Sequence, residues 1–231
     1  MSIVRATNLT KRFGSTLALQ AVNLDLQPGR VIGLLGPNGS GKTTFLKLCN
    51  GLIPPTEGTV TVDGHAPGLE TKAVISYLPD ASYFNDWMKV SDMLSFFNDF
   101  YADFDAAKAR EMLKALDILP NANIKALSKG TKEKVQLILV MARKAKLYLL
   151  DEPIGGVDPA ARDYILRTII QNYHPEASVV ISTHLIADVE PVLDEAIFLK
   201  NGQIVLHEDV DSIRETKGMS VDQLFREVFK C

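Results

Sequence analysis

The chain has 231 residues, enough to bury the core of one large domain or of one domain with an inserted lobe. Its residues are 46% hydrophobic and 23% charged, ordinary values for a globular protein, which argues against intrinsic disorder. The net charge of −3 has the wrong sign for a general nucleic-acid binder. We therefore expect no nucleic acid as the main partner.

The cysteines and the apolar runs argue against a disulfide-rich, a secreted or a membrane-spanning protein. Cys49 lies in a predicted helix and Cys231 is the last residue, so we expect neither a disulfide framework nor a cysteine metal site, and a reducing cytoplasm suits this usage. The first ten residues lack the apolar run of a signal peptide, and residues 137–142, the longest apolar stretch, are too few to span a bilayer. Any membrane connection is expected to pass through a partner protein.

Short β-type runs dominate the first third of the chain. Strands are predicted at residues 3–6, 21–26, 30–35, 59–62 and 74–78. The third run is nearly all apolar, as in a strand that is buried on both faces of a sheet. It leads through a glycine-rich loop into a helix that is predicted over residues 42–50.

The pattern becomes helical in the middle of the chain. Ser91 is expected to cap one helix and Asp105 a second, and a third helix is predicted over residues 132–143. Strands and helices then alternate, with strands at residues 146–150, 178–182, 196–199 and 203–206, helices from Pro159 and Leu185, and two short helices after residue 209.

This alternation indicates an α/β fold with a mainly parallel sheet. The whole chain, residues 1–231, is predicted to be a single domain. Residues 1–81 and 145–231 are expected to form its α/β core, and residues 82–144 a helical lobe inserted into that core.

The glycine-rich loop matches the pattern G-x-x-x-x-G-K-[ST] in full. Its glycines let successive backbone N–H groups form an anion nest at a helix N-terminus. Lys42 is expected to reach the β- and γ-phosphates of a nucleotide, and the Thr43 hydroxyl to bind Mg²⁺. A glycine-rich turn with a chance lysine is the alternative, but a buried strand before the loop and a helix after it favour phosphate binding. The predicted nucleotide-binding residues here are Gly36, Pro37, Asn38, Gly39, Ser40, Gly41, Lys42, Thr43 and Thr44.

Two carboxylates, Asp151 and Glu152, follow the apolar run of residues 147–150. The carboxyl end of such a strand is where α/β folds bind ligands. Asp151 is expected to hold Mg²⁺, and Glu152 to orient or deprotonate the water that attacks the γ-phosphate. An acidic pair after a strand is more often a solvated turn or a helix cap, but the phosphate loop upstream favours the metal site.

With these motifs and four further features, the sequence resembles the ABC ATPase family over nearly its whole length. Residues 127–132 are similar to the LSGGQ signature of that family, and residues 155–159 resemble its D-loop. His184 stands at the place of the switch histidine, and Phe13 at that of an aromatic residue that stacks on adenine.

Each of these features also has a simpler interpretation. Phe13 could be a core residue, and His184 a satisfied histidine at a helix start. Ser128 and Gly130 could be a helix cap and its turn, and Asp158 can cap the next helix. Their shared order and spacing nevertheless make the combined match highly specific.

The resemblance implies a P-loop NTPase core with a mainly parallel sheet, an N-terminal antiparallel β subdomain and the inserted helical lobe. It also implies an Mg²⁺-dependent ATPase in the cytoplasm, held at the inner face of the cell membrane by a transmembrane permease subunit. The chain would form a homodimer, or a heterodimer with a related ATPase.

In such a dimer each ATP would lie between the phosphate loop of one copy and the signature segment of the other. Ser128, Gly130 and Asp158 would then contact nucleotide, and Glu152 and His184 would be the catalytic residues. ATP binding would close the dimer and hydrolysis would reopen it.

Two positions depart from the family pattern. Asp80 stands where a glutamine is usual, so Thr43, Asp80 and Asp151 are the candidate metal ligands. A turn after Pro79 is an equally supported interpretation of Asp80. In the signature, Lys129 replaces a glycine and Thr131 replaces the glutamine, and Lys129 is either a cation for the opposite phosphate or an exposed helix lysine. These departures resemble a branch of Gram-positive peptide and antimicrobial exporters.

The helical lobe carries many aromatic residues, most of which are expected to pack its own core. We expect Asp80 and part of residues 83–88, with Trp87 as an anchor, to border a groove that receives a helix of the membrane subunit. Two other classes stay open. A soluble ABC protein acting on DNA or ribosomes is disfavoured by the single cassette, and a nucleotide-sensing regulatory subunit without turnover is disfavoured by Glu152.

Overall fold

The computed structural model describes residues 1–230, except for the side chain of Ala160, and the prediction for Cys231 lies outside the described residues. The strands are β1 (Val4–Phe13), β2 (Thr16–Leu26), β3 (Val31–Leu35), β4 (Glu57–Val62), β5 (Ile75–Leu78), β6 (Leu147–Asp151), β7 (Ser178–Thr183), β8 (Glu195–Lys200) and β9 (Gln203–Asp209). The helices are α1 (Lys42–Cys49), α2 (Leu69–Val74), α3 (Val90–Phe100), α4 (Ala106–Ala115), α5 (Lys129–Met141), α6 (Pro159–Asn172), α7 (Ile186–Val189), α8 (Val210–Lys217) and α9 (Val221–Val228), with 3-10 turns η1 (Ile124–Ala126) and η2 (Glu190–Val192).

The strands of residues 1–230 form two sheets. The larger has six strands in the order β5-β6-β7-β3-β8-β9, and the smaller has three in the order β2-β1-β4. Neighbours in the larger sheet run parallel except for the β8–β9 pair, and the smaller sheet is antiparallel. This architecture confirms the predicted fold class.

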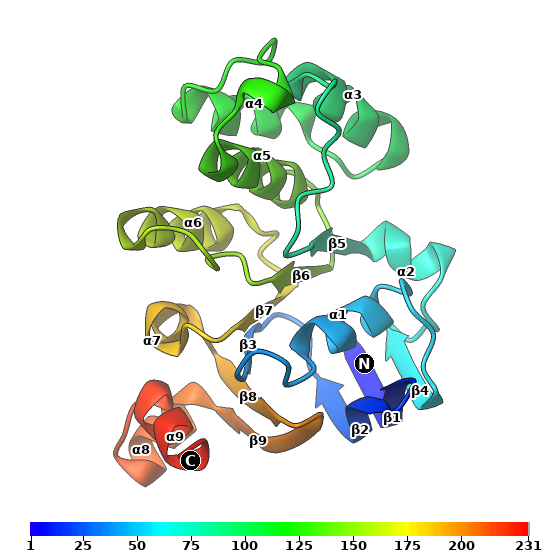
Figure 1. The fold of residues 1–231 in the computed structure, drawn as a ribbon, viewed down its shortest axis with the longest axis vertical. Coiled ribbons are helices and arrows are strands. Elements are labelled where there is room, and N and C mark those ends of the chain that lie inside the picture. The colour runs from blue at the N-terminus through cyan, green and yellow to red at the C-terminus, as the bar shows by residue number, and fades with distance from the viewer. Residues whose placement is uncertain (231) are drawn as a thin grey trace.

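The larger sheet is covered on both faces (Figure 1). Helix α1 and the smaller sheet lie on one face, and α6, α7, α8 and α9 lie on the other. The side chains of β3 alternate between them: Val31 and Leu35 join the core on the α6 side, and Ile32 and Leu34 the core on the α1 side. A central parallel strand needs apolar residues on both faces, which explains why this run is apolar almost throughout.

Several predicted boundaries are wrong. The hairpin β1–β2 runs far beyond the short apolar runs, because its outer half pairs through the backbone while exposing polar side chains. Helix α2 was not predicted. Helix α3 begins after Lys89, whose N–H donates to Asp92 Oδ2 at 2.9 Å, and not at Ser91. Helix α5 begins at Lys129 because Ser128 is its cap.

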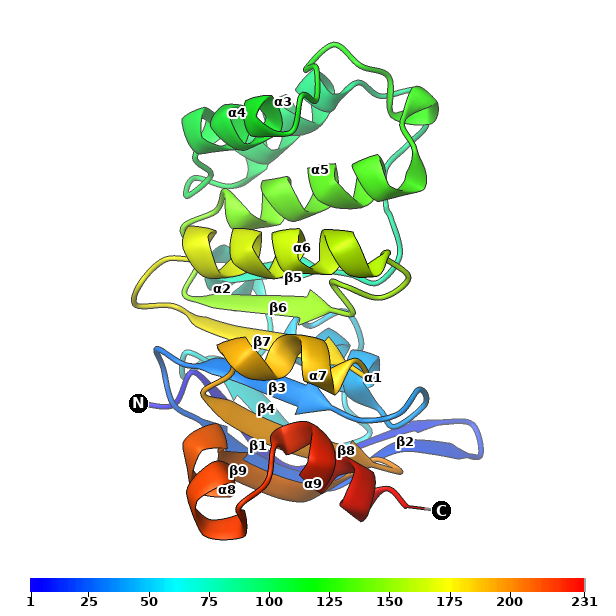
Figure 2. The same cartoon turned by 90° about the vertical axis from the view of Figure 1, so that its left-hand side faces the viewer.

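The helices α3, α4 and α5 lie together beyond the β5 edge of the larger sheet (Figure 2). They share a core of their own that includes Met93, Phe97, Leu113 and Ile138. Only part of the aromatic content packs inside this core, because Trp87 and several other rings are exposed. The limits of the predicted lobe, 82 and 144, remain a prediction. Over residues 1–230 no helix combines the length and apolarity that a membrane span requires.

Arg143 connects these helices to the sheet. Its guanidinium is buried and donates to both carboxylate oxygens of Asp103, at 2.9 and 3.1 Å. It also donates to the carbonyl oxygens of Ile75 and, at 2.9 Å, Ala73, and it lies 3.8 Å from the ring centre of Tyr101. The planar fork of an arginine can satisfy this many acceptors at once, whereas a lysine cannot.

Replacing Arg143 by methionine should destabilise the protein, because the buried carbonyl oxygens lose their donor and Asp103 loses its counter-ion. We expect the free energy of unfolding to fall by about 2–4 kcal/mol in urea titrations. Arg226→Met is the matched control, since Arg226 pairs with Asp222 on the surface. That control should change stability by less than about 1 kcal/mol. Equal values for the two variants would contradict the anchoring role.

Candidate nucleotide-binding site

The loop between β3 and α1 has a shape that requires glycine. Gly39 and Gly41 adopt φ values of +80° and +111°, a region that other residues rarely occupy. A Cβ atom on Gly41 would lie 2.5 Å from the carbonyl oxygen of Ala18, and one on Gly36 would collide with the carbonyl oxygen of Leu199. The loop therefore needs glycine for its backbone angles and also for the space around it.

Lys42 lies in the first turn of α1 and its side chain is only 5% exposed. Its ammonium group donates to the carbonyl oxygens of Gly36, at 2.8 Å, and Pro37, at 3.3 Å. It also lies 3.2 Å from Glu152 Oε1. The lysine is thus held between the phosphate loop and the carboxylate that follows β6.

Asp151 joins the ends of neighbouring strands. Its Oδ1 accepts hydrogen bonds from Thr43 Oγ1, at 3.0 Å, and Ser182 Oγ, at 2.6 Å. Asp151 on β6 pairs with Ser182 on β7, and Leu35 on β3 pairs with Thr183, so the three strands end at one level. The parallel register therefore brings Thr43, Asp151 and Ser182 together.

Burial raises the pKa of the Asp151 carboxyl, and the hydrogen bonds from Ser182 and Thr43 partly lower it again. The neighbouring charges of Asp80 and Glu152 add to the increase in pKa. The buried negative charge of Asp151 is therefore unfavourable without a cation, and a bound positive ion would stabilise it.

The donor set fits Mg²⁺. Among the hydrogen bonds of residues 1–230, the buried Asp151 Oδ2 has no partner, which leaves a carboxylate oxygen for a ligand. The described residues contain no cluster of three or more His, Cys, Asp or Glu side chains that could cage a metal. Magnesium is usually held by one or two carboxylates together with substrate phosphates, so Thr43 and Asp151 suit it.

The Glu152 side chain contacts Lys42, Thr183 and His184. Its backbone has φ +48°, which is uncommon outside glycine, and its N–H donates to the Ser182 carbonyl oxygen at 2.9 Å. Its Oε2 accepts from Thr183 Oγ1 at 3.1 Å and lies 3.1 Å from His184 Nδ1. The carboxylate therefore contacts Lys42 through one oxygen and His184 through the other.

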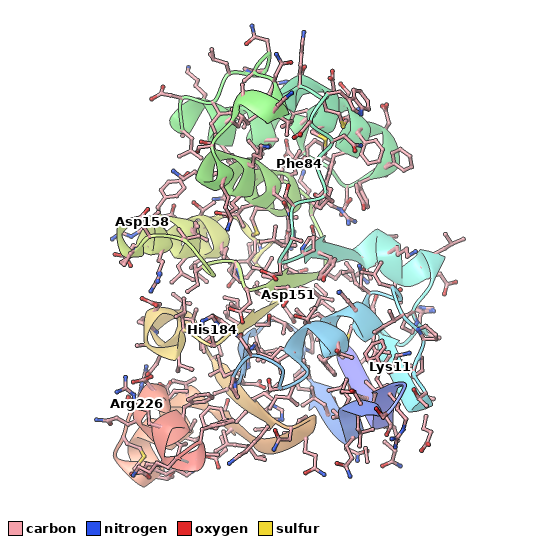
Figure 3. All side chains as sticks on the ribbon, in the orientation of Figure 1. Lys11, Phe84, Asp151, Asp158, His184 and Arg226 are labelled. Atoms are coloured by element: carbon pink, nitrogen blue, oxygen red, sulfur yellow. The ribbon has the colours of Figure 1, made fainter. Side chains whose placement is uncertain are left out.

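The predicted residues fall in two places. The phosphate loop, Asp151, Glu152 and His184 lie together, whereas Ser128, Gly130 and Asp158 line a separate groove of about 310 Å³ between α5 and the start of α6. Figure 3 shows Asp151 and His184 near the middle of the molecule and Asp158 at the outer end of α6. Within residues 1–230, Ser128 and Gly130 share no hydrogen bond or ion pair with the first group.

Asp80 is exposed and lines a cavity of about 350 Å³ together with Asp151 and Glu152. Asp80 does not line the groove between the lobe and the core, although the preceding Pro79 does. The buried Gln136 of α5 donates to the Pro79 carbonyl oxygen at 3.2 Å and so holds the backbone next to Asp80. Metal binding by Asp80 and a turn at this position both stay predictions.

Phe13, at the end of β1, is 50% exposed, so its interpretation as a core residue is wrong. Its ring lies 5.0 Å from the Lys11 ammonium. The β1–β2 hairpin runs beside the phosphate loop, since Ala18 of β2 lies against Gly41. Stacking of Phe13 on a base remains a prediction.

The hydroxyls of Ser182 and Thr183, which donate to Asp151 and Glu152, were not predicted from the sequence. Their position could have indicated them, since Ser182 and Thr183 are the two residues before His184 at the end of an apolar strand. Adjacent strand ends in a parallel sheet share an edge, so hydroxyl residues there lie within reach of the neighbouring carboxylates.

Comparison with known proteins identifies the family of the chain. The sequence model of the family described as ABC transporter matches residues 19–155. An uncharacterized ABC transporter ATP-binding protein of Methanocaldococcus jannaschii is 32% identical over 220 residues, 91% of this chain and 79% of that protein. The linearmycin resistance ATP-binding protein LnrL of Bacillus subtilis is 29% identical over 211 residues, 88% of this chain and 68% of that protein.

Solved structures show the same fold. The ATP-binding subunit of an ABC transporter is 26% identical, with a TM-score of 0.88 over 99% of this chain and 100% of that one. A second structure shows an ATP-binding cassette as a dimer in a post-hydrolysis state, bound to ADP and Pi. It is 24% identical, with a TM-score of 0.77 over 89% of this chain and 98% of that one, and supports the fold alone.

Gly41→Ala should distort the phosphate loop, because the new methyl group would meet Ala18 and the backbone would be strained. We expect the affinity for a fluorescent ATP analogue to fall at least about tenfold, equivalent to about 1.4 kcal/mol. Gly14→Ala is the control, since Gly14 also has a positive φ, +56°, but has open space around it. It should lose about 1 kcal/mol of stability and no affinity. Unchanged affinity in Gly41→Ala would contradict this role of the loop.

Proposed function

The chain belongs to the ABC transporter family of ATP-binding proteins, and we propose that it is the ATP-hydrolysing motor of a membrane transporter. The observation that carries the proposal is the meeting of Lys42, Thr43, Asp151 and Glu152 at the carboxyl ends of parallel strands. This is the edge at which α/β sheets bind ligands.

Substrate binding would rearrange Lys42. The loop N–H groups and the α1 N-terminus would receive the phosphates, and Lys42 would exchange the carbonyl oxygens of Gly36 and Pro37 for phosphate oxygens. Thr43 and Asp151 would hold Mg²⁺, which when bound supplies positive charge that neutralises charge developing on the transferred phosphoryl group. Asp80 lines the same cavity as Asp151 and could add a second carboxylate.

Glu152 would act on the attacking water. In the nucleotide-free chain Lys42 Nζ lies 3.2 Å from Glu152 Oε1, so the ammonium group occupies the oxygen that would face the water. Once Lys42 turns to phosphate, Oε1 becomes available to orient the water and accept its proton. His184, held at Nδ1 by Oε2, would present its other nitrogen to the γ-phosphate.

A second copy would complete the site. Ser128 and Gly130 are exposed at the N-terminus of α5, where the helix dipole favours an anion, and Lys129 beside them is 82% exposed. Their separation from the phosphate loop of their own chain supports a dimer in which they reach the nucleotide of the other copy. A solved ATP-binding cassette of the same fold is itself a dimer bound to ADP and Pi.

Glu152→Gln tests the proposed catalytic cycle. We expect the rate of Mg²⁺-dependent ATP hydrolysis to fall at least about 100-fold while ATP still binds, since the amide cannot accept the proton. Light scattering should then detect an ATP-dependent dimer. The control is Glu176→Gln, which changes an exposed carboxylate at the opposite end of β7. Equal activity in both variants would rule out Glu152 as the base, and ATP binding without turnover in the unmodified chain would favour a sensory role.

A groove of about 700 Å³ separates the helical lobe from the core, and we propose that a cytoplasmic helix of the permease binds there. Its walls are largely apolar yet open to solvent: Leu69 is 90% exposed, Phe100 69% and Tyr83 43%. Exposed apolar surface of this kind suits an amphipathic helix. Such a contact would hold the chain at the inner face of the membrane.

The lining of the groove points to Phe100, and not to Trp87, as the aromatic residue that would anchor the permease helix. Trp87 is exposed but does not line this groove, whereas Phe100 does and stacks against Phe96 with ring centres 4.4 Å apart. Phe100→Asp should therefore reduce the fraction of the chain that sediments with membranes of its own cells, without changing ATP affinity. Trp87→Ala is the comparison and should leave sedimentation unchanged. Loss in Trp87→Ala and not in Phe100→Asp would place the partner elsewhere.

The departures at Asp80 and Lys129, together with similarity to a linearmycin resistance protein, support an exporter in the peptide and antimicrobial branch. Cargo selection would belong to the membrane subunit.

A further inference from the structure

Arg162, in the first turn of α6, connects two segments of the candidate site. Its Nε donates to the carbonyl oxygen of Val157 at 3.2 Å, and its Nη1 donates to Asp188 Oδ2 at 2.9 Å. Val157 belongs to the loop that begins at Glu152. Asp188 lies on α7, four residues after His184. One guanidinium therefore ties this loop to the helix that follows His184.

The same two segments are also joined at their other ends. Glu152 Oε2 accepts from Thr183 Oγ1 and lies 3.1 Å from His184 Nδ1. The segments 152–158 and 183–188 thus form a closed ring with Arg162 at one side and the Glu152 carboxylate at the other. A shift of either segment would strain both connections.

The charge of Arg162 is unfavourably placed for its own helix. A cation in the first turn of a helix opposes the helix dipole. The ion pair with Asp188 is also partly exposed, with side-chain exposures of 22% and 36%, and pairs of this kind contribute little to stability. Its contacts therefore act mainly on the relative placement of the two segments.

We propose that Arg162 is a positioning residue that transmits the placement of residues 157–158 to His184. Asp158 shares a groove with Ser128 and Gly130, the face to which the second copy is assigned. Closure of the dimer against this loop would move Val157, and Arg162 would carry that movement through Asp188 to α7. The inference rests on the proposed function, since it concerns the coupling of the dimer face to the hydrolytic site.

The test compares Arg162→Ala, Asp188→Ala and the double variant by steady-state ATP hydrolysis. We expect kcat to fall about tenfold and KM for ATP to stay within about twofold, because placement changes while phosphate contacts remain. The double variant should be no slower than either single variant, as expected for one shared connection. Arg162→Lys should be intermediate, since a lysine nitrogen cannot span both acceptors. Arg226→Ala, which breaks an exposed pair, is the control.

Amide hydrogen exchange without nucleotide gives a second measurement that needs no turnover. In Arg162→Ala, exchange should accelerate about tenfold within both segments, at residues 154–158 of the first and 184–188 of the second, and not in α1. Unchanged exchange in residues 184–188 would overturn the inference, as would single-variant effects on kcat that multiply in the double variant. If the unmodified chain did not hydrolyse ATP, the proposed function would fail and the exchange result alone would decide on the connection.

Discussion

The pair of hydrogen bonds that Asp151 accepts from Thr43 and Ser182 connects the parts on which the nucleotide site depends. A carboxylate is costly to bury unless it is paired, and burial raises the pKa of this one. The two hydroxyls reduce that penalty, and an available oxygen remains for a cation. The positive N-terminal end of α1 and the Lys42 ammonium lie at the same loop. A bound phosphate there would be stabilised by both, and a metal ion would neutralise the Asp151 carboxylate.

This arrangement follows from a parallel sheet in which β3, β6 and β7 end at one level. The residues that follow each parallel strand lie at the same edge of the sheet, the edge formed by the carboxyl ends of the strands. The phosphate loop, the acidic pair and residues 182–184 therefore lie close together although they are far apart in the chain. Glu152 turns toward its neighbours through a positive φ that the backbone hydrogen bond to Ser182 supports.

Two other connections extend from this edge. Arg143 fixes the helical lobe to the strand next to β6, so that the groove between lobe and core keeps a defined wall. Arg162 links the loop after Glu152 to α7 on the opposite face from α1. Both arginines use the same property, a planar fork that holds a carboxylate and a backbone carbonyl at once.

The sequence by itself determined the glycine loop, the acidic pair and the alternation of strands and helices, because each depends on residues that are neighbours in the chain. The glycine pattern reflects local backbone angles, and the apolar run of β3 reflects burial on both faces. Tertiary structure alone decided the length of the polar hairpin, the exposure of Phe13 and the contacts of both arginines. These depend on strand register and on packing between distant segments, which leave no local pattern in composition or spacing.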